Sequence, residues 1–276
     1  MHHANQCLNC AHHLETEDKF CPECGQAAKT HPRITMHHIS HEVVHAVAHA
    51  DKGFFHLIRA LATQPGTTIK EYLSGKHKKY FSPFSFFFIV LGIYVLSNSI
   101  LRPFDSVTTT STTYTKDGKT YTQKYPSKKQ QEKFNKISAR VATAMNFMNT
   151  RTNIVLCIST PFIALIMFLL YRRKLFYAEQ LVIMTFVNGF LNLLSIFIFT
   201  PLMYFAKGTH FYMVLVMAMM LTHLVYIAIV YHSILNLSAT IKGYIQATLT
   251  ALAGLIGWII LSFTLIFLYI MWGVLF

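Results

Sequence analysis

The chain has 276 residues, of which 53% are hydrophobic and only 13% are charged, whereas a soluble domain carries about 25% charged residues. The deficit is concentrated after residue 80, where long apolar segments follow one another. Because a membrane-spanning helix needs roughly 20 mostly apolar residues, the composition excludes an ordinary soluble protein. The formal charge of +13 is typical of Lys and Arg flanking membrane spans and argues against nucleic acid as a partner.

The first recognisable pattern is CLNC…CPECG, in which ten residues separate two C-x-x-C pairs and glycine follows the second pair. Four thiolates at this spacing can close a tetrahedral site, for which zinc is the expected ion. The predicted ligands are Cys7, Cys10, Cys21 and Cys24. With no open coordination position, the zinc is expected to be structural, because so short a segment has too little core to fold without metal. Thiolates stay metallated in a reducing compartment, which predicts a cytoplasmic N-terminus.

A histidine-rich, helix-compatible stretch follows and contains HEVVH, residues 41 to 45. One helical turn separates His41 from His45, as in zinc proteases, and Glu42 would be the catalytic base that activates zinc-bound water. The stretch is so rich in histidine that such a pair also arises easily by chance. Three interpretations stay open: a catalytic site with a second zinc, a non-catalytic metal or proton-sensing site, and a helix lying at the membrane surface.

A protease would need a third zinc ligand, and HEVVH is not part of a longer protease signature. The acidic or histidine side chains within reach along the sequence are His49, Asp51 and Glu71. The HEVVH motif also lies about forty residues before the first span, whereas intramembrane proteases place theirs inside a span.

Lysines and aromatic residues gather directly before the first apolar segment, as in a membrane-interface collar. They are Lys70, Tyr72, Lys76, Lys78, Lys79, Tyr80 and Phe81. Lysines at this position could each contribute about 1 kcal/mol of attraction to an anionic leaflet. The lipid bilayer is therefore the first expected partner.

The predicted fold class is mainly α: a polytopic helical membrane protein with about five spans and a small N-terminal zinc ribbon. The spans are expected near residues 82–101, 154–171, 180–205, 211–231 and 244–272. The polar insertion 102–153 contains TTYTKDGKTYT, a β-hairpin signal, followed by a lysine-rich amphipathic helix. The predicted domains are a zinc ribbon (1–28), a cytoplasmic segment of histidine-rich helices and collar (29–80), and the transmembrane domain (81–276).

The charges that flank the spans predict the orientation. The sides expected to be cytoplasmic carry Lys70, Lys76, Lys78, Lys79, Arg172, Arg173, Lys174 and Lys242, against Arg102, Arg151 and Lys207 near the opposite ends. Positive residues favour the cytoplasmic side. The prediction is an inner-membrane protein with a cytoplasmic N-terminus, an extracytoplasmic C-terminus and an extracytoplasmic hairpin-plus-helix insertion.

Polar residues inside the spans are further candidates. Asn188 and Asn192 share one face of the third span with Thr185 and Ser195. This face predicts either hydrogen bonds between helices or, less simply, the lining of a transport path. His223, in the fourth span, is the ionisable residue within a span and is a functional candidate for that reason.

Four sequence patterns in this order resemble a known family: CxxC…CPxCGQ, then HExxH…DKG, then PG…EYLSGKHKKYFSPFSFFF, and later YRRKLFYAEQLVIMTF. Together they resemble the DUF3667 family of uncharacterised bacterial membrane proteins, most specifically over residues 7 to 90. The resemblance implies a zinc-ribbon head on a multi-pass membrane domain and implies no activity. One departure is visible, because the family often has EHLVF where this chain has Glu179-Gln180-Leu181-Val182-Ile183.

The leading hypothesis is a non-enzymatic docking, sensing or scaffold protein of the bacterial inner membrane, with a protein partner bound through the zinc ribbon. It rests on the complete ribbon and on a sequence without a recognisable nucleophile, phosphate loop or carboxylate pair. The first alternative is a membrane metalloprotease using HEVVH. The second is a small-molecule or lipid transporter that uses the polar faces of the spans.

Overall fold

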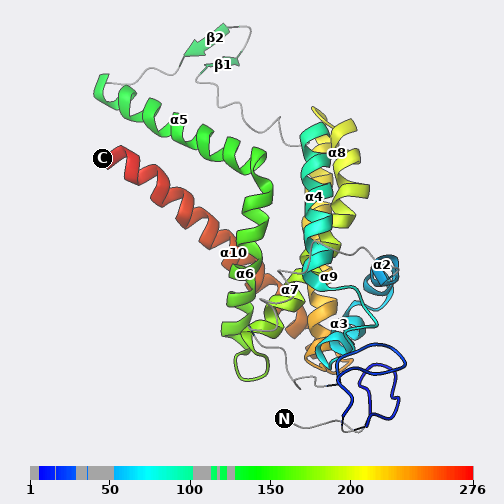
Figure 1. The fold of residues 1–276 in the computed structure, drawn as a ribbon. Coiled ribbons are helices and arrows are strands. Elements are labelled where there is room, and N and C mark those ends of the chain that lie inside the picture. The colour runs from blue at the N-terminus through cyan, green and yellow to red at the C-terminus, as the bar shows by residue number, and fades with distance from the viewer. Residues whose placement is uncertain are drawn as a thin grey trace.

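The structure is a computed structural model that describes residues 6–15, 17–28, 36, 53–101, 113–116, 119–122 and 128–275. Within these residues the fold is mainly helical (Figure 1). The helices are α2 (Gly53–Thr63), α3 (Pro65–Leu73), α4 (Pro83–Leu101), α5 (Lys128–Thr150), α6 (Thr152–Tyr171), α7 (Tyr177–Leu194), η2 (Ser195–Phe199), α8 (Thr200–Phe205), α9 (His210–Ile234) and α10 (Ile241–Leu275). Two short strands, β1 (Thr113–Lys116) and β2 (Lys119–Thr122), pair antiparallel.

Five helical segments of the described chain are long and apolar enough to cross a membrane, which confirms the predicted number of spans. Their bounds are Pro83–Leu101, Ile154–Tyr171, Tyr177–Phe205, His210–Ile234 and Ile241–Tyr269. Each lies within a few residues of the predicted range, because a continuous run of apolar side chains is a strong signal for a spanning helix. The chain is therefore a helical membrane protein by length and composition of its helices.

The third span lies at the centre of the membrane domain. It is 78% buried, whereas the other four are between 11% and 33% buried, and it packs against both α4 and α6. Gly189 permits the close approach of α4, because a Cβ at this position would lie 2.7 Å from the ring of Phe86. The span is also irregular near its end, where the π-helix η2 precedes Pro201, a residue that cannot donate a backbone hydrogen bond.

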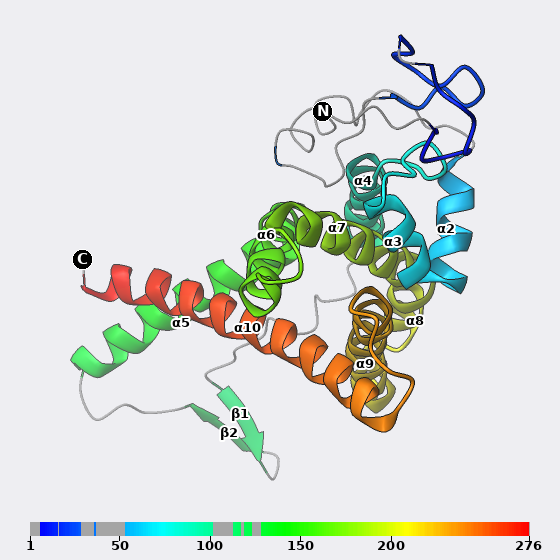
Figure 2. The ribbon, with the colours of Figure 1, turned by 90° about the horizontal axis from the view of Figure 1, so that it is seen from below.

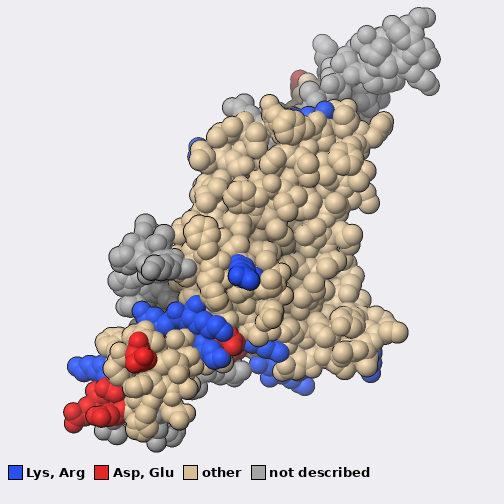
Figure 3. All heavy atoms as spheres, turned by 90° about the vertical axis from the view of Figure 1, so that its right-hand side faces the viewer, with Lys and Arg blue, Asp and Glu red and all other residues tan. Residues whose placement is uncertain are grey.

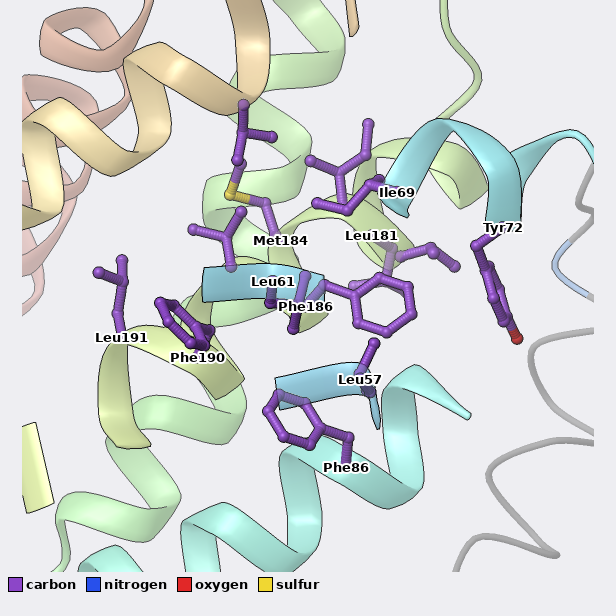
Figure 4. Close-up of a cluster of buried hydrophobic side chains, with 14 of the residues drawn as sticks. Leu57, Leu61, Ile69, Tyr72, Phe86, Leu181, Met184, Phe186, Phe190 and Leu191 are labelled. Atoms are coloured by element: carbon purple, nitrogen blue, oxygen red, sulfur yellow. The ribbon is translucent and has the colours of Figure 1, made fainter. Parts of the chain in front are cut away.

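Helices α2 and α3, which precede the first span, share its hydrophobic core. Figure 4 shows Leu57 and Leu61 from α2, and Ile69 and Tyr72 from α3, packed around Phe186 of α7. These side chains are no more than 1% exposed. Full burial of such side chains contributes roughly 1.5–3 kcal/mol each. Helices α2 and α3 are thus part of the same folded unit as the spans.

Helices α9 and α10 complete the bundle and connect it to α2 and α3. A Cβ at Gly66 of α3 would lie 2.1 Å from the Cβ of Ser233 in α9, so only glycine permits this contact. The hydroxyl of Tyr226 in α9 donates to the backbone oxygen of Leu61 at 3.1 Å. Helix α10 runs along one side of the bundle, where it packs against α9 and α6, and it also contacts α5 (Figure 2).

Candidate metal centre and its attachment to the helices

Residues 6–15 and 17–28, called the head below, consist of two hairpins with the same hydrogen-bond pattern. The N–H of Cys7 donates to the oxygen of His12 at 2.8 Å, and the N–H of Cys21 donates to the oxygen of Gln26 at 2.7 Å. In both hairpins the donor is the first cysteine of a C-x-x-C pair and the acceptor lies five residues later. The repeated spacing in the sequence therefore folds into a repeated structure.

A backbone with positive φ follows the second cysteine of each pair. Ala11 has φ of +61° and Gly25 has φ of +70°, and their N–H groups donate to the oxygens of Cys7 and Cys21, both at 2.8 Å. Glycine adopts this conformation at no steric cost, whereas alanine is strained there by roughly 1–2 kcal/mol. The turn places both cysteine side chains of a pair on the same side of the hairpin.

The four cysteines meet between the two hairpins. Their sulfur atoms all lie within 4.8 Å of one another, with Cys7 Sγ 3.5 Å from Cys24 Sγ and Cys10 Sγ 3.6 Å from Cys21 Sγ. Sulfurs bound tetrahedrally at about 2.3 Å from one zinc ion would be about 3.8 Å apart. The four thiols are free and lie close enough to bind one metal ion, as the spacing predicts.

A buried side chain of the head forms hydrogen bonds to the loop that follows α3. Gln26 is 3% exposed, its Nε2 donates to the oxygen of Gly75 at 2.8 Å, and its Oε1 accepts from the N–H of Lys78 at 3.4 Å. Gly75 has φ of +103°, and a Cβ there would lie 2.8 Å from Leu8 of the head. The amide of Gln26 thus connects the second cysteine hairpin to the loop between α3 and α4, a contact that the sequence did not predict.

Beside this attachment point, Glu71 accepts hydrogen bonds from three side chains. Lys76 Nζ lies 2.9 Å from one carboxylate oxygen, while Lys79 Nζ and the Tyr80 hydroxyl each lie 2.6 Å from the other. These contacts, with that of Lys76 the largest, lower the pKa of Glu71 to about 2. The carboxylate in turn raises the pKa of Lys79. The cluster holds the loop after α3 in place.

Replacing Glu71 by glutamine is expected to lower the stability at neutral pH by about 1–2 kcal/mol, after allowance for the partial exposure of the lysines. Because the folded pKa is depressed, the carboxylate stabilises the fold above its unfolded pKa of 4.5, and this contribution is lost as the pH falls toward about 2. Thermal unfolding in detergent between pH 7 and pH 3 measures the effect. The difference in unfolding temperature between Glu71→Gln and wild type should shrink at acid pH. Glu132→Gln, a control at an exposed position, should unfold at the wild-type temperature. A difference for Glu71→Gln that does not change with pH would contradict the prediction.

The proposed protease residues His41, Glu42 and His45 lie outside the described residues, as do His49 and Asp51. Glu71 is the candidate third ligand that the structure describes. Both of its oxygens are taken by the cationic and hydroxyl donors of the cluster above. A carboxylate in this state is a poor metal ligand, because binding would require it to give up these partners.

Most of the polar residues predicted as candidates in the spans form hydrogen bonds inside the bundle. Asn188 Nδ2 donates to Thr160 Oγ1 of α6 at 2.9 Å, and Asn192 is 7% exposed. Thr185 and Ser195, on the same face of the span, donate to backbone oxygens one turn earlier. His223 is half-buried and its Nδ1 lies 2.8 Å from the oxygen of Met219 in its own helix.

A second buried glutamine, Gln180, was also missed as a structural residue. It is fully buried and accepts a hydrogen bond of 2.5 Å from the Tyr231 hydroxyl of α9. The ring of Tyr231 stacks on that of Tyr171 in α6, whose hydroxyl contacts Thr250 of α10. Gln180 occupies one of the two positions at which the chain differs from the EHLVF pattern, the other being Ile183. The departure in sequence thus coincides with a polar contact that joins α6, α7, α9 and α10.

Comparison with known proteins gives one family. No curated protein and no solved structure matches the chain. The matched segment is residues 51–95. It includes α2, α3, the loop whose Gly75 and Lys78 contact Gln26, and the first part of α4. The family model that matches these residues is described as "Protein of unknown function (DUF3667)", which confirms the resemblance drawn from the sequence motifs over this segment.

Proposed function

We propose that this chain is a non-enzymatic docking or sensing protein of the bacterial inner membrane, in which a zinc-stabilised head presents a binding surface for a protein partner. The proposal includes a zinc ribbon (1–28), a cytoplasmic segment (29–80) and a transmembrane part (81–276), although α2 and α3 of the cytoplasmic segment share one hydrophobic core with the spans. Its principal support is the contact of Gln26 with Gly75 and Lys78. This contact gives the metal-binding hairpin a fixed position on the helices instead of leaving it on a free tether.

Zinc is the ion that fits the donor set. Four thiolates at nearly tetrahedral distances favour zinc over hard ions such as calcium or magnesium, which prefer oxygen ligands. A site closed by four protein ligands leaves no position for water or substrate, so the ion would stabilise the head and would not perform catalysis. Because Gln26 follows the ligand Cys24 by two residues, metal binding and attachment of the head would be coupled.

The distribution of charged residues supports a cytoplasmic location of the head. Lysines and arginines gather where the head meets the apolar body of the molecule, and the acidic residues lie mainly on the head itself (Figure 3). A band of positive charge at this level is typical of the cytoplasmic membrane surface. With five spans, the C-terminus would then be extracytoplasmic, together with β1, β2 and α5.

Neither alternative function gains a supporting observation. A metalloprotease needs a third ligand, and the described candidate, Glu71, is held by Lys76, Lys79 and Tyr80. A transporter needs polar side chains that face a path, and the polar face of α7 is instead hydrogen-bonded within the bundle.

Metal analysis of the purified full-length protein tests the proposal. We expect one zinc ion per chain, and the same value in a variant that carries both His41→Ala and His45→Ala. A second zinc that this double variant loses would instead favour the metalloprotease. Absence of zinc from freshly purified, reduced protein would contradict the structural role of the head.

A further inference from the structure

A second site lies far from the head, where α5, α6 and α10 meet. A groove of about 450 Å³ lies among these helices, and its walls are almost entirely apolar. Its lining includes Ala144, Phe147, Ile158, Trp258, Leu265 and Tyr269. A volume of this size falls within the range of about 300–1,000 Å³ that is usual for small-molecule sites. Helix α5 and the later part of α10 extend away from α4 and α9 (Figures 1 and 2), so the groove can open to the bilayer from the side.

A cation lies at the edge of this apolar groove. Arg140 of α5 donates from one guanidinium nitrogen to the backbone oxygen of Tyr269 at 2.8 Å, and its guanidinium carbon lies 5.1 Å from the centre of the Tyr269 ring. These contacts fix the position of the guanidinium beside a residue that lines the groove. An arginine has five N–H donors in a planar fork, and the donors that Tyr269 does not engage suit the oxygens of a phosphate.

Helix α5 adds further positive charge beside Arg140. Lys133 and Lys136 precede it by seven and four residues, so all three occupy one face of the helix. Among the described side chains of α5, Glu132 is the only acidic one. The surface next to the apolar groove is therefore complementary to an anion.

One polar group inside the groove has no assigned role. The hydroxyl oxygen of Ser262, a lining residue of α10, is buried and has no hydrogen-bond partner among the described residues. An unsatisfied buried hydroxyl costs about 1–3 kcal/mol. A ligand that places an oxygen, such as that of an ester carbonyl, within reach of Ser262 would remove this cost.

From these observations we propose that the groove binds a phospholipid with an anionic headgroup. One acyl chain lies along the apolar walls, and the headgroup phosphate lies against Arg140, with Lys133 and Lys136 nearby. The apolar groove suits the acyl chain of such a lipid, and the adjacent cation suits its phosphate. The site is independent of the metal centre, and its test does not depend on the function proposed for the head.

The two tryptophans of the chain make the site measurable. In a Trp272→Phe background, the fluorescence of Trp258 reports on the groove, and lipids with brominated acyl chains quench it on contact. In phosphatidylcholine vesicles, brominated phosphatidylglycerol should bind in the groove, and so quench Trp258, with about fivefold higher affinity than brominated phosphatidylcholine. This ratio is expected for about one favourable charge contact. Arg140→Gln should abolish the preference, and Ala144→Phe should reduce quenching by both lipids because its ring fills the groove.

Two matched variants serve as controls. Arg173→Gln removes the same charge from an exposed position beyond the other end of α6, and Ala139→Phe adds the same ring to an exposed position of α5 outside the groove. Both should behave as the parent protein. Three results would each overturn the proposal. The two lipids could quench equally, the preference could survive Arg140→Gln, or no brominated lipid could reach Trp258 because a second copy of the chain covers it.

Discussion

Replacing Cys24 by serine is expected to remove the metal from the head and to unfold it, while the spans stay in the membrane. Structural zinc sites of this kind contribute roughly 10–16 kcal/mol to the folding of small domains, and the buried cluster of the head consists only of Cys7, Leu14, Cys21 and Ala28. So small a core cannot offset the conformational entropy of the chain without the ion.

The measurement combines zinc content with limited trypsin digestion of the membrane-inserted protein. Lys19 lies within the head, and its backbone oxygen accepts a hydrogen bond from the N–H of Ala28 at 3.0 Å, so cleavage there should be slow in wild type and rapid in the variant. Cys157→Ser, which removes the exposed cysteine of α6, is the control and should retain both zinc and protection. A Cys24→Ser protein that keeps its zinc and its resistance to trypsin would show that the four cysteines do not hold a structural ion.

Replacing Gln26 by alanine is expected to loosen the head from the helices without releasing the metal. The variant leaves the oxygen of Gly75 and the N–H of Lys78 without their partner, which should cost about 1–2 kcal/mol, or a 5- to 30-fold larger fraction of detached heads. Gln26→Glu should have a similar effect, because a carboxylate cannot donate to the oxygen of Gly75. Hydrogen–deuterium exchange of residues 74–80, measured at one zinc per chain, follows the detachment.

The repeat within the head supplies the control for this experiment. His12 occupies in the first hairpin the position of Gln26 in the second, and its side chain is exposed. His12→Ala should therefore leave the exchange of residues 74–80 unchanged. Faster exchange in all three variants would indicate general damage to the head, whereas unchanged exchange in both Gln26 variants would exclude the attachment role of Gln26.

Local pattern explains which features of the site could be predicted. The four cysteines follow from spacing, because two hairpins with identical turns bring two pairs of sulfurs together. The number of spans follows from apolar length. The role of Gln26 could not be predicted, because nothing in the sequence around CPECGQ indicates that its amide reaches Gly75, 49 residues away along the chain. Gln180 and Tyr231, 51 residues apart, could not be paired for the same reason.

Glu71 illustrates the same limit for chemistry. Its sequence position made it a candidate metal ligand, but the turn after α3 brings Lys76, Lys79 and Tyr80 onto its carboxylate. The charge of a side chain can be read from the sequence, whereas its partners depend on where the chain turns back. The lysines of the collar, expected to face the lipid surface, proved in part to be partners of this one carboxylate.

The sequence by itself determined the helical membrane class, the number of spans and the four-cysteine cluster, because apolar run length and ligand spacing act over short distances along the chain. Only the tertiary structure decided that α7 is the central helix and that α2 and α3 share its core. It likewise decided that Gln26 attaches the head and that Arg140 lies at the edge of an apolar groove. Each of these depends on contacts between residues far apart in the chain, and such contacts are set by the packing of whole helices.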